Sequence, residues 1–363
     1  LLPNAGSFGM AVSTAMIFGL VSLMFLDTSI NMAMQPFKMM VGDMVNEKQK
    51  GLAYSIQSFL CNAGSLVGFL FPFIFTWIGI SNIAPQGVVP DSVIYSFYIG
   101  AAILILCVIY TTVKVKEMPP AEYAEYHGIT EEEEKEKINM VKLLIKAPKA
   151  FWTVGLVQFF CWFAFMFMWT YTNGSVAANV FDAPTVETAV NGVSKVMLDT
   201  KSIQYQDAAD WVGVLFAVQA IGSVLWAVCI PLFKDRKLIY SLSLVLGGLG
   251  FISTYFVHNQ YVLFISFLLI GCAWAAMLAL PFTILTNALS GGHMGTYLGL
   301  FNGTICIPQI VAASLGGSIL ALFTPKGMLP PEINMLVMAG VMLIIGAVCV
   351  YLIKETKGEQ TKA

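Results

Sequence analysis

Charged residues are scarce in this chain, making up 11% of its 363 residues, whereas hydrophobic residues make up 58%. A soluble domain typically has about 25% charged residues and about 45–50% apolar residues. The mean hydropathy is +0.78, and the apolar residues run in continuous blocks of about 20, the length that crosses a bilayer. These features argue against a soluble enzyme, a nucleic-acid binder and a disordered chain. They indicate an integral membrane protein whose surroundings are the lipid bilayer.

Other kinds of chemistry are also poorly represented. All seven cysteines lie inside apolar segments, so they do not form the disulfide framework of polar loops, and three histidines make a weak case for zinc. The motifs GxxxxGK[ST], HExxH and GxSxG are missing from the sequence. We therefore expect no enzyme activity, no metal and no cofactor. The seven cysteines are Cys61, Cys107, Cys161, Cys229, Cys272, Cys306 and Cys349.

The apolar blocks predict an all-α membrane fold with nine transmembrane helices. Membrane strands would alternate in hydropathy, which these blocks do not. The predicted spans are 10–42, 51–80, 92–115, 149–173, 209–233, 238–257, 260–289, 296–323 and 331–353.

The long polar segments divide the chain into parts. Residues 1–115 would be the remainder of an N-terminal bundle with three spans, and 116–148 a solvated central loop. Residues 149–353 would form a C-terminal bundle of six helices, followed by a tail at 354–363. Six spans after a central loop, an odd total and a start at Leu1 favour a transporter of six plus six helices without its first three. An ordinary protein with nine spans is the alternative.

The basic residues predict the orientation. If the first span runs inward, most of the 19 basic residues lie in cytoplasmic segments, and Lys195, Lys201 and Lys326 lie outside. We expect a multi-pass protein of the inner or plasma membrane, monomeric, with its central loop and C-terminus in the cytoplasm.

One polar stripe stands out in the first span. At 100° per residue, Asp27, Asn31, Gln35 and Lys38 fall within about 80° of one another. A charged side chain inside a bilayer costs about 2.5–3.5 kcal/mol, so it faces a cavity or a partner. The stripe is either a hydrogen-bonded seam between helices or a wet pathway for substrate and ion, and two formal charges favour the pathway.

The two charges have different predicted roles. Asp27 lies near the middle of the span without a local cation, and low dielectric disfavours its charged form. It is therefore a candidate for exchanging a proton. Lys38, next to Pro36, either donates hydrogen bonds to a polyol or extends to the membrane interface. Asp43 is a candidate boundary residue.

Amides, aromatic rings, glycines and prolines supply further candidates in other spans. Gln57 is either a sugar ligand or a structural residue, and Gly64 and Gly68 are a pair typical of helix packing. In the fourth span, Gln158, Trp162, Phe165 and Trp169 share one face, as a sugar site requires, although tryptophan also marks membrane interfaces. Later spans hold Pro281 and Pro308, which free backbone groups, and Asn302 and Gln309, which lie on one face.

The chain resembles a known family at several of these positions. The strings LDTSINMAMQPFKMMVGDM and KGLAYSIQSFLCNAGSLVG resemble helices four and five of the sucrose and maltose proton symporters. These symporters are a branch of the major facilitator superfamily, near the glycoside–pentoside–hexuronide group. ALPFTILTN and GTYLGLFNGTICIPQI are similar to later parts of that family. PLFKDRK, with Asp235 and Arg236, resembles its DRxGR-like loop but lacks the glycine and the final base. Lys38 stands where the family usually has arginine.

The resemblance implies a function. It implies helices 4–12 of twelve, alternating access, and uptake of a disaccharide with a proton. Asp27 would couple the proton, and the polar stripe and amides above would bind the sugar. Maltose, sucrose, trehalose and longer glucans all suit such a stripe. Alternatives are a sodium- or proton-coupled symporter of the melibiose or hexuronide type, an efflux pump for amphipathic compounds, and a sensor with a transporter fold.

Overall fold

The computed structural model describes residues 12–80, 91–116, 119, 122, 140–190, 193–289, 294–325 and 327–353. Its elements are almost all helices, which confirms the predicted all-α membrane fold. Eight segments of the described chain are long and apolar enough to cross a membrane. The predicted span 51–80 is not among them. It is nevertheless helical over most of its length.

The chain forms two compact units. Unit 1 comprises residues 1–45 and 67–128, and unit 2 comprises residues 46–66 and 129–363. Unit 1 holds α1 (Val12–Met44), the second half of α2 (Glu47–Trp77) and α3 (Asp91–Lys114). Within unit 1, Phe75 of α2 packs against Tyr95 of α3 with their ring centroids 6.4 Å apart. The predicted division at 115 and 149 stays a prediction.

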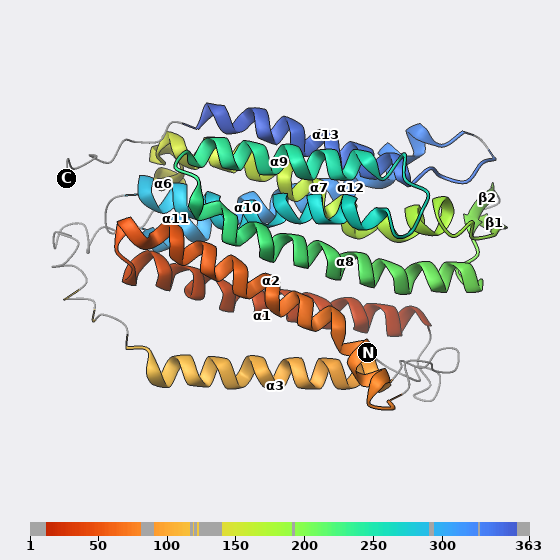
Figure 1. The fold of residues 1–363 in the computed structure, drawn as a ribbon, viewed down its shortest axis with the longest axis horizontal. Coiled ribbons are helices and arrows are strands. Elements are labelled where there is room, and N and C mark those ends of the chain that lie inside the picture. The colour runs from red at the N-terminus through yellow and green to blue at the C-terminus, as the bar shows by residue number, and fades with distance from the viewer. Residues whose placement is uncertain are drawn as a thin grey trace. The chain divides into compact units, whose positions relative to one another are not determined.

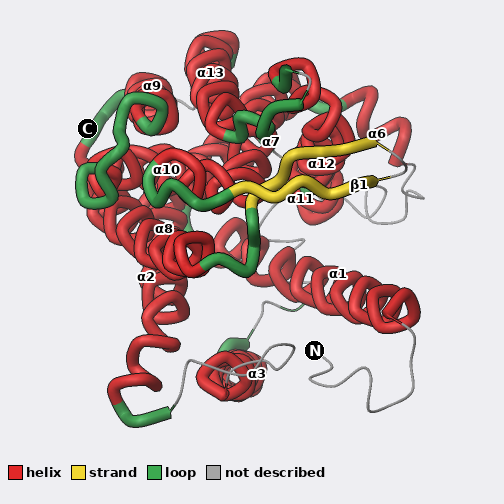
Figure 2. The backbone as a smooth tube through the Cα atoms, turned by 90° about the vertical axis from the view of Figure 1, so that its right-hand side faces the viewer, coloured by secondary structure: helices red, strands yellow, loops and turns green. Residues whose placement is uncertain are grey.

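Unit 2 is a helical bundle whose long helices run side by side (Figures 1 and 2). It begins with residues 47–66 of α2. The short helix α6 (Met140–Lys146) follows within the predicted central loop 116–148. Its long helices are α7 (Lys149–Asn179), α8 (Ile203–Cys229), α9 (Arg236–Ser253), α10 (Leu263–Ala288), α12 (Gly303–Phe323) and α13 (Ile333–Cys349). Short elements are α11 (Met294–Phe301), η2 (Ile230–Leu232) and η3 (Val350–Leu352).

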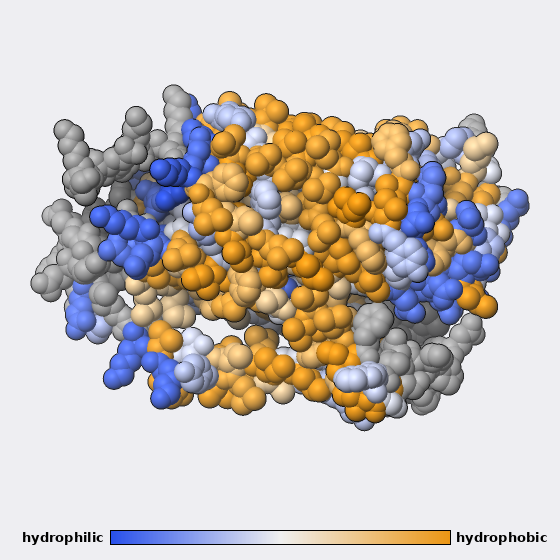
Figure 3. Space-filling view, viewed as in Figure 1, coloured by the Kyte–Doolittle hydropathy of each residue, from blue (hydrophilic) through white to orange (hydrophobic). Residues whose placement is uncertain are grey.

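The centre of unit 2 is formed by α7 and α10. About two thirds of each is buried, 67% of the membrane-spanning window in both cases. α10 packs against α8 and α9, and α7 packs against α12 and α13. Close approach of α8 and α10 depends on glycine, because a Cβ on Gly222 would come 2.5 Å from the carbonyl oxygen of Leu268. Hydrophobic side chains cover the visible face of α8, α9 and α13, and hydrophilic ones gather at its ends (Figure 3).

A β-hairpin lies between the predicted spans 149–173 and 209–233. Strands β1 (Thr185–Val190) and β2 (Val193–Leu198) are antiparallel, with Thr185 opposite Leu198 and Val190 opposite Val193. Both strands contain β-branched residues, which suit a pleated ribbon. The hairpin follows the last turn of α7 (Figure 1), and we call this the hairpin end of unit 2.

Candidate functional site

An aromatic and amide cluster lies between α7 and α10. We define the α7–α10 cluster as Gln158, Trp162, Phe165 and Trp169 of α7 with Trp274 of α10. The ring of Trp274 lies 5.7 Å from Trp162, 4.9 Å from Phe165 and 5.7 Å from Trp169, measured between centroids. Positions 158, 162, 165 and 169 recur at helical spacing, so one stripe of α7 faces α10. The structure thus brings together the four residues of α7 that the sequence placed on one face.

Gln158 binds a backbone carbonyl that a proline leaves free. Pro281 lies inside α10 and has no N–H to donate to the carbonyl oxygen of Met277, four residues earlier. The side-chain Nε2 of Gln158 donates to that oxygen at 3.2 Å. The amide nitrogen of Gln158 therefore satisfies the carbonyl group that Pro281 leaves without a helical partner. The predicted site residue Gln158 and the predicted structural residue Pro281 thus belong to one local arrangement.

Two polar atoms of the cluster are buried without partners. Oε1 of Gln158 and Nε1 of Trp162 have no hydrogen-bond partner among the described residues. Gln158 is 0% exposed and Trp162 9%, whereas Trp169 is 44% exposed and marks the open edge of the cluster. Buried polar groups without partners are rare in proteins and mark strain, function or a missing ligand. Here the residue with the free acceptor, Gln158, and the residue with the free donor, Trp162, are separated by a rise of about 6 Å along α7. Both lie beside aromatic rings.

The first half of α2 contributes polar residues to the same unit. The Ser58 hydroxyl donates to the carbonyl oxygen of Ala275 on α10 at 3.3 Å, and Asn62 Nδ2 donates to the Ser58 carbonyl at 2.7 Å. Asn62 is fully buried. Nε2 of Gln57 is buried with no hydrogen-bond partner in the described part of the chain. Gln57 thus has an unused donor, and Asn62, whose Nδ2 bonds within its own helix, has an unused acceptor in its Oδ1.

The predicted stripe of the first span lies on α1 in unit 1. Asp27 is exposed within this unit, and Asn31 Nδ2 donates to the backbone carbonyl of Asp27 at 2.9 Å. Gln35, Lys38 and Asp43 belong to α1, but their side chains lie outside the described part of the structure. The amide of Asn31 therefore bonds locally, and the role of the stripe stays a prediction.

The predicted span 296–323 corresponds to one candidate membrane span, Gly295–Phe323, in which the single residue Asn302 separates α11 from α12. The hydroxyl of Thr304 donates to the carbonyl oxygen of Phe301 at 2.7 Å, so a side chain enters the backbone ladder at this point. Oδ1 of Asn302 is buried without a partner among residues described in the structure. Gln309 is half-buried on α12 and directly follows the buried Pro308.

The remaining predicted residues have structural surroundings. Asp235 caps α9, since its Oδ1 accepts from the backbone N–H of Lys237 at 2.9 Å and of Leu238 at 3.1 Å. Arg236 is the half-buried first residue of that helix. Among the described residues, a Cβ on Gly64 or Gly68 would meet nothing within 4 Å, so this part of the chain shows no close contact at the predicted packing pair.

Two residues of interest escaped the sequence reasoning. Trp274 lies in the middle of a span, far from any polar loop, and that position distinguishes it from interface tryptophans. Glu332 directly precedes α13. It lies at the edge of the predicted span 331–353, and its surroundings depend on the fold of α7.

The fold and the cluster define a helical multi-pass membrane protein with polar groups held between its helices. The sequence model of the Major Facilitator Superfamily matches residues 4–194 and 176–363, and the chain belongs to this superfamily of transporters. The family is one of transporters and not of enzymes. No curated protein matches the chain.

Solved structures show the same fold. The chain is similar to the crystal structure of a variant of the E. coli fucose:proton symporter FucP, with a TM-score of 0.52 and 16% identity. The match covers 86% of this chain and 71% of that structure. At this identity, the similarity establishes the fold alone.

Proposed function

We propose that the protein is a secondary active transporter that takes up a disaccharide of the maltose or sucrose type together with a proton. The observation that supports this proposal is the α7–α10 cluster. Aromatic faces there adjoin the unpaired Oε1 of Gln158 and the unpaired Nε1 of Trp162.

This combination of groups suits a sugar. The C–H faces of a pyranose ring pack on aromatic rings, and its hydroxyls both donate and accept hydrogen bonds. An amide oxygen would accept from one hydroxyl, and an indole N–H would donate to another. Because Gln158 is fully buried, a sugar reaches it only when the helices move, which alternating access provides. We propose Gln57, Asn302 and Gln309 as additional ligands, with Asn31, Gln35 and Lys38 of α1.

Asp27 is the proposed coupling group. Protonation would remove a charge that is costly inside a bilayer, and sugar and proton would then favour the same conformation. Coupling of this kind requires that each ligand bind the two conformations with different affinity. The sequence resemblance to the sucrose and maltose proton symporters supports the assignment. FucP is itself named as a fucose:proton symporter.

The test is uptake of labelled maltose, sucrose and trehalose by the full-length protein in proteoliposomes, under an imposed proton gradient or an imposed sodium gradient. We expect accumulation driven by the proton gradient. Accumulation driven by sodium would favour a symporter of the melibiose or hexuronide type. Indifference to sugars, with export of amphipathic compounds, would favour an efflux pump. Lack of any flux would favour a sensor.

A further inference from the structure

The carboxyl group of Glu332 lies directly on the backbone of α7 at the hairpin end of unit 2. Pro330 and Pro331 restrict the chain that leads to it, and Glu332 itself precedes the first turn of α13. A Cβ built on Gly174 would lie 2.5 Å from Cδ and 2.8 Å from Oε1 of Glu332. Only glycine at position 174 leaves room for this carboxyl group.

The surroundings of Glu332 offer little charge. Its side chain makes no capping hydrogen bond to α13. α13 packs against α7 and α9, and more lightly against α12. α7 presents Tyr171, whose hydroxyl would be 2.6 Å from a Cβ on Gly316 of α12. The hairpin-end halves of α9 and α12 contain no charged residue, and Lys326 lies outside the described residues. Burial raises the pKa of Glu332 to about 7.

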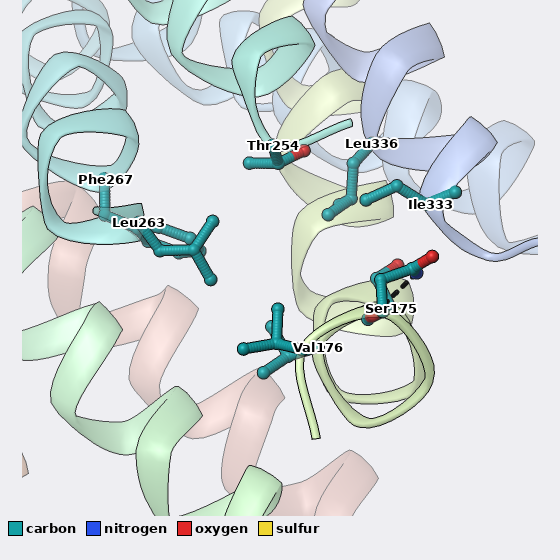
Figure 4. A pocket seen from close by; sticks show the side chains of 9 residues that line it. Ser175, Val176, Thr254, Leu263, Phe267, Ile333 and Leu336 are labelled. Atoms are coloured by element: carbon teal, nitrogen blue, oxygen red, sulfur yellow. Dashed lines mark hydrogen bonds between the residues drawn. The ribbon is translucent and has the colours of Figure 1, made fainter. Parts of the chain in front are cut away.

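Next to this contact, the helices leave a small cavity of about 10 Å³. It is lined by Ile333 and Leu336 of α13, by Ser175 and Val176 of α7, and by Thr254, Leu263 and Phe267 among others (Figure 4). The hydroxyls of Ser175 and Thr254 already donate to backbone carbonyls at 2.7 Å. A cavity of this size holds about one water, and its polar groups offer that water few partners.

We propose that Glu332 is a proton-binding site and that its proton keeps the hairpin ends of α7 and α13 packed together. A neutral carboxyl group can lie against the α7 backbone at low cost, whereas an ionised one requires water or a cation. Hydration would lift the side chain from Gly174 and loosen the contact of α13 with α7. This inference does not rest on the proposed transport function, because proton binding can be measured without a substrate.

The direction of the pH effect follows from the two pKa values. The pKa of Glu332 is about 7 in the packed state, above the value of 4.5 for a hydrated glutamate. The packed state therefore holds the proton more tightly than the loosened state. Packing is strongest below pH about 4.5, weakens as the pH rises to about 7, and changes little beyond that.

The first test is a pH titration of the full-length protein by infrared spectroscopy. Because Asp27 is itself a proposed proton-binding carboxyl group, all variants are made in an Asp27→Asn background. We expect a protonated-carboxyl band in Asp27→Asn that disappears with a midpoint near pH 7 and is missing once Glu332→Gln is added. The control Glu187→Gln removes an exposed carboxylate of the hairpin and should leave the band unchanged. Lys326→Gln should leave the midpoint in place. The same band in Glu332→Gln, or a midpoint that moves in Lys326→Gln, would overturn the proposal.

The second test is hydrogen–deuterium exchange of residues 172–180 and 333–340. At pH 5, the wild type and Glu332→Gln should exchange alike. At pH 8, the wild type should exchange on the order of tenfold faster than Glu332→Gln, which stays neutral. Gly174→Ala should displace the carboxyl group and raise exchange already at pH 5. A ratio of wild type to Glu332→Gln that stays constant between pH 5 and pH 8 would contradict the proposed role of the proton.

Discussion

Trp162 illustrates how single residues distinguish a binding site from a core. Its indole ring packs against Trp274, yet its N–H is buried without an acceptor in the part of the chain that the structure describes. An unpaired buried donor costs about 1–3 kcal/mol. A core under selection for stability alone would replace it with phenylalanine. The proposed sugar hydroxyl supplies the acceptor that the protein lacks.

Replacing Trp162 tests this interpretation. Trp162→Phe keeps an aromatic ring but removes the N–H. We therefore expect KM for the transported sugar to rise by up to about tenfold, which corresponds to the free energy of one hydrogen bond. The measurement is initial uptake over a range of sugar concentrations. Trp152→Phe is the matched control, because Trp152 lies on the same helix and is 52% exposed. An unchanged KM in Trp162→Phe would exclude Trp162 as a ligand.

Sequence spacing predicts which residues share a face but not what they bond to. The grouping of Gln158, Trp162, Phe165 and Trp169 follows from the helical period alone. Gln158 also donates a hydrogen bond to the carbonyl oxygen of Met277. This bond depends on how α7 packs against α10, which the sequence does not reveal. Glu332 was missed for the same reason, since its environment comes from Gly174, distant in the chain.

At the scale of helices, the bond between α7 and the kink of α10 is the feature with the clearest consequence. Gln158→Leu should leave the Met277 carbonyl unpaired and destabilise the protein by about 1–3 kcal/mol. In a Pro281→Ala background, the alanine N–H can restore the helical bond, and Gln158→Leu should then cost less. Thermal unfolding of the four proteins in detergent gives the coupling energy.

Gln309→Leu serves as the control for this cycle. Gln309 is half-buried on α12. The change in unfolding free energy caused by Gln309→Leu should be the same with and without Pro281→Ala. If the changes in unfolding free energy caused by Gln158→Leu and Pro281→Ala are also additive, Gln158 does not stabilise the kink.

Helix existence was predictable, and helix interruptions were not. Long apolar runs define α3, α7, α8, α10 and α13 because lipid requires that each backbone group be satisfied within the helix. At Asn302, between α11 and α12, the hydroxyl of Thr304 donates to the carbonyl oxygen of Phe301, a local hydrogen bond that hydropathy does not predict. The hairpin at 185–198 lies in a segment of mixed polarity, where strand pairing competes with an irregular loop.

At the scale of the whole molecule, the family and the multi-pass architecture are established, and the orientation is a prediction from basic residues. We expect Lys201→Cys to react with a membrane-impermeant maleimide in intact cells and Lys234→Cys to react only after lysis. Both native side chains are exposed. The seven native cysteines are first replaced by serine or alanine. The reverse labelling pattern would invert the topology and the direction assigned to transport.

The coupling of proton and sugar is the central claim, and Asp27 is where it is tested most directly. The measurement compares the full-length wild type with Asp27→Asn in proteoliposomes, recording both accumulation of labelled disaccharide under an inward proton gradient and exchange of sugar at equal concentrations. Asparagine keeps the size of the side chain but cannot release a proton. We predict that Asp27→Asn loses accumulation and retains exchange. Full accumulation driven by the proton gradient in Asp27→Asn would contradict the account.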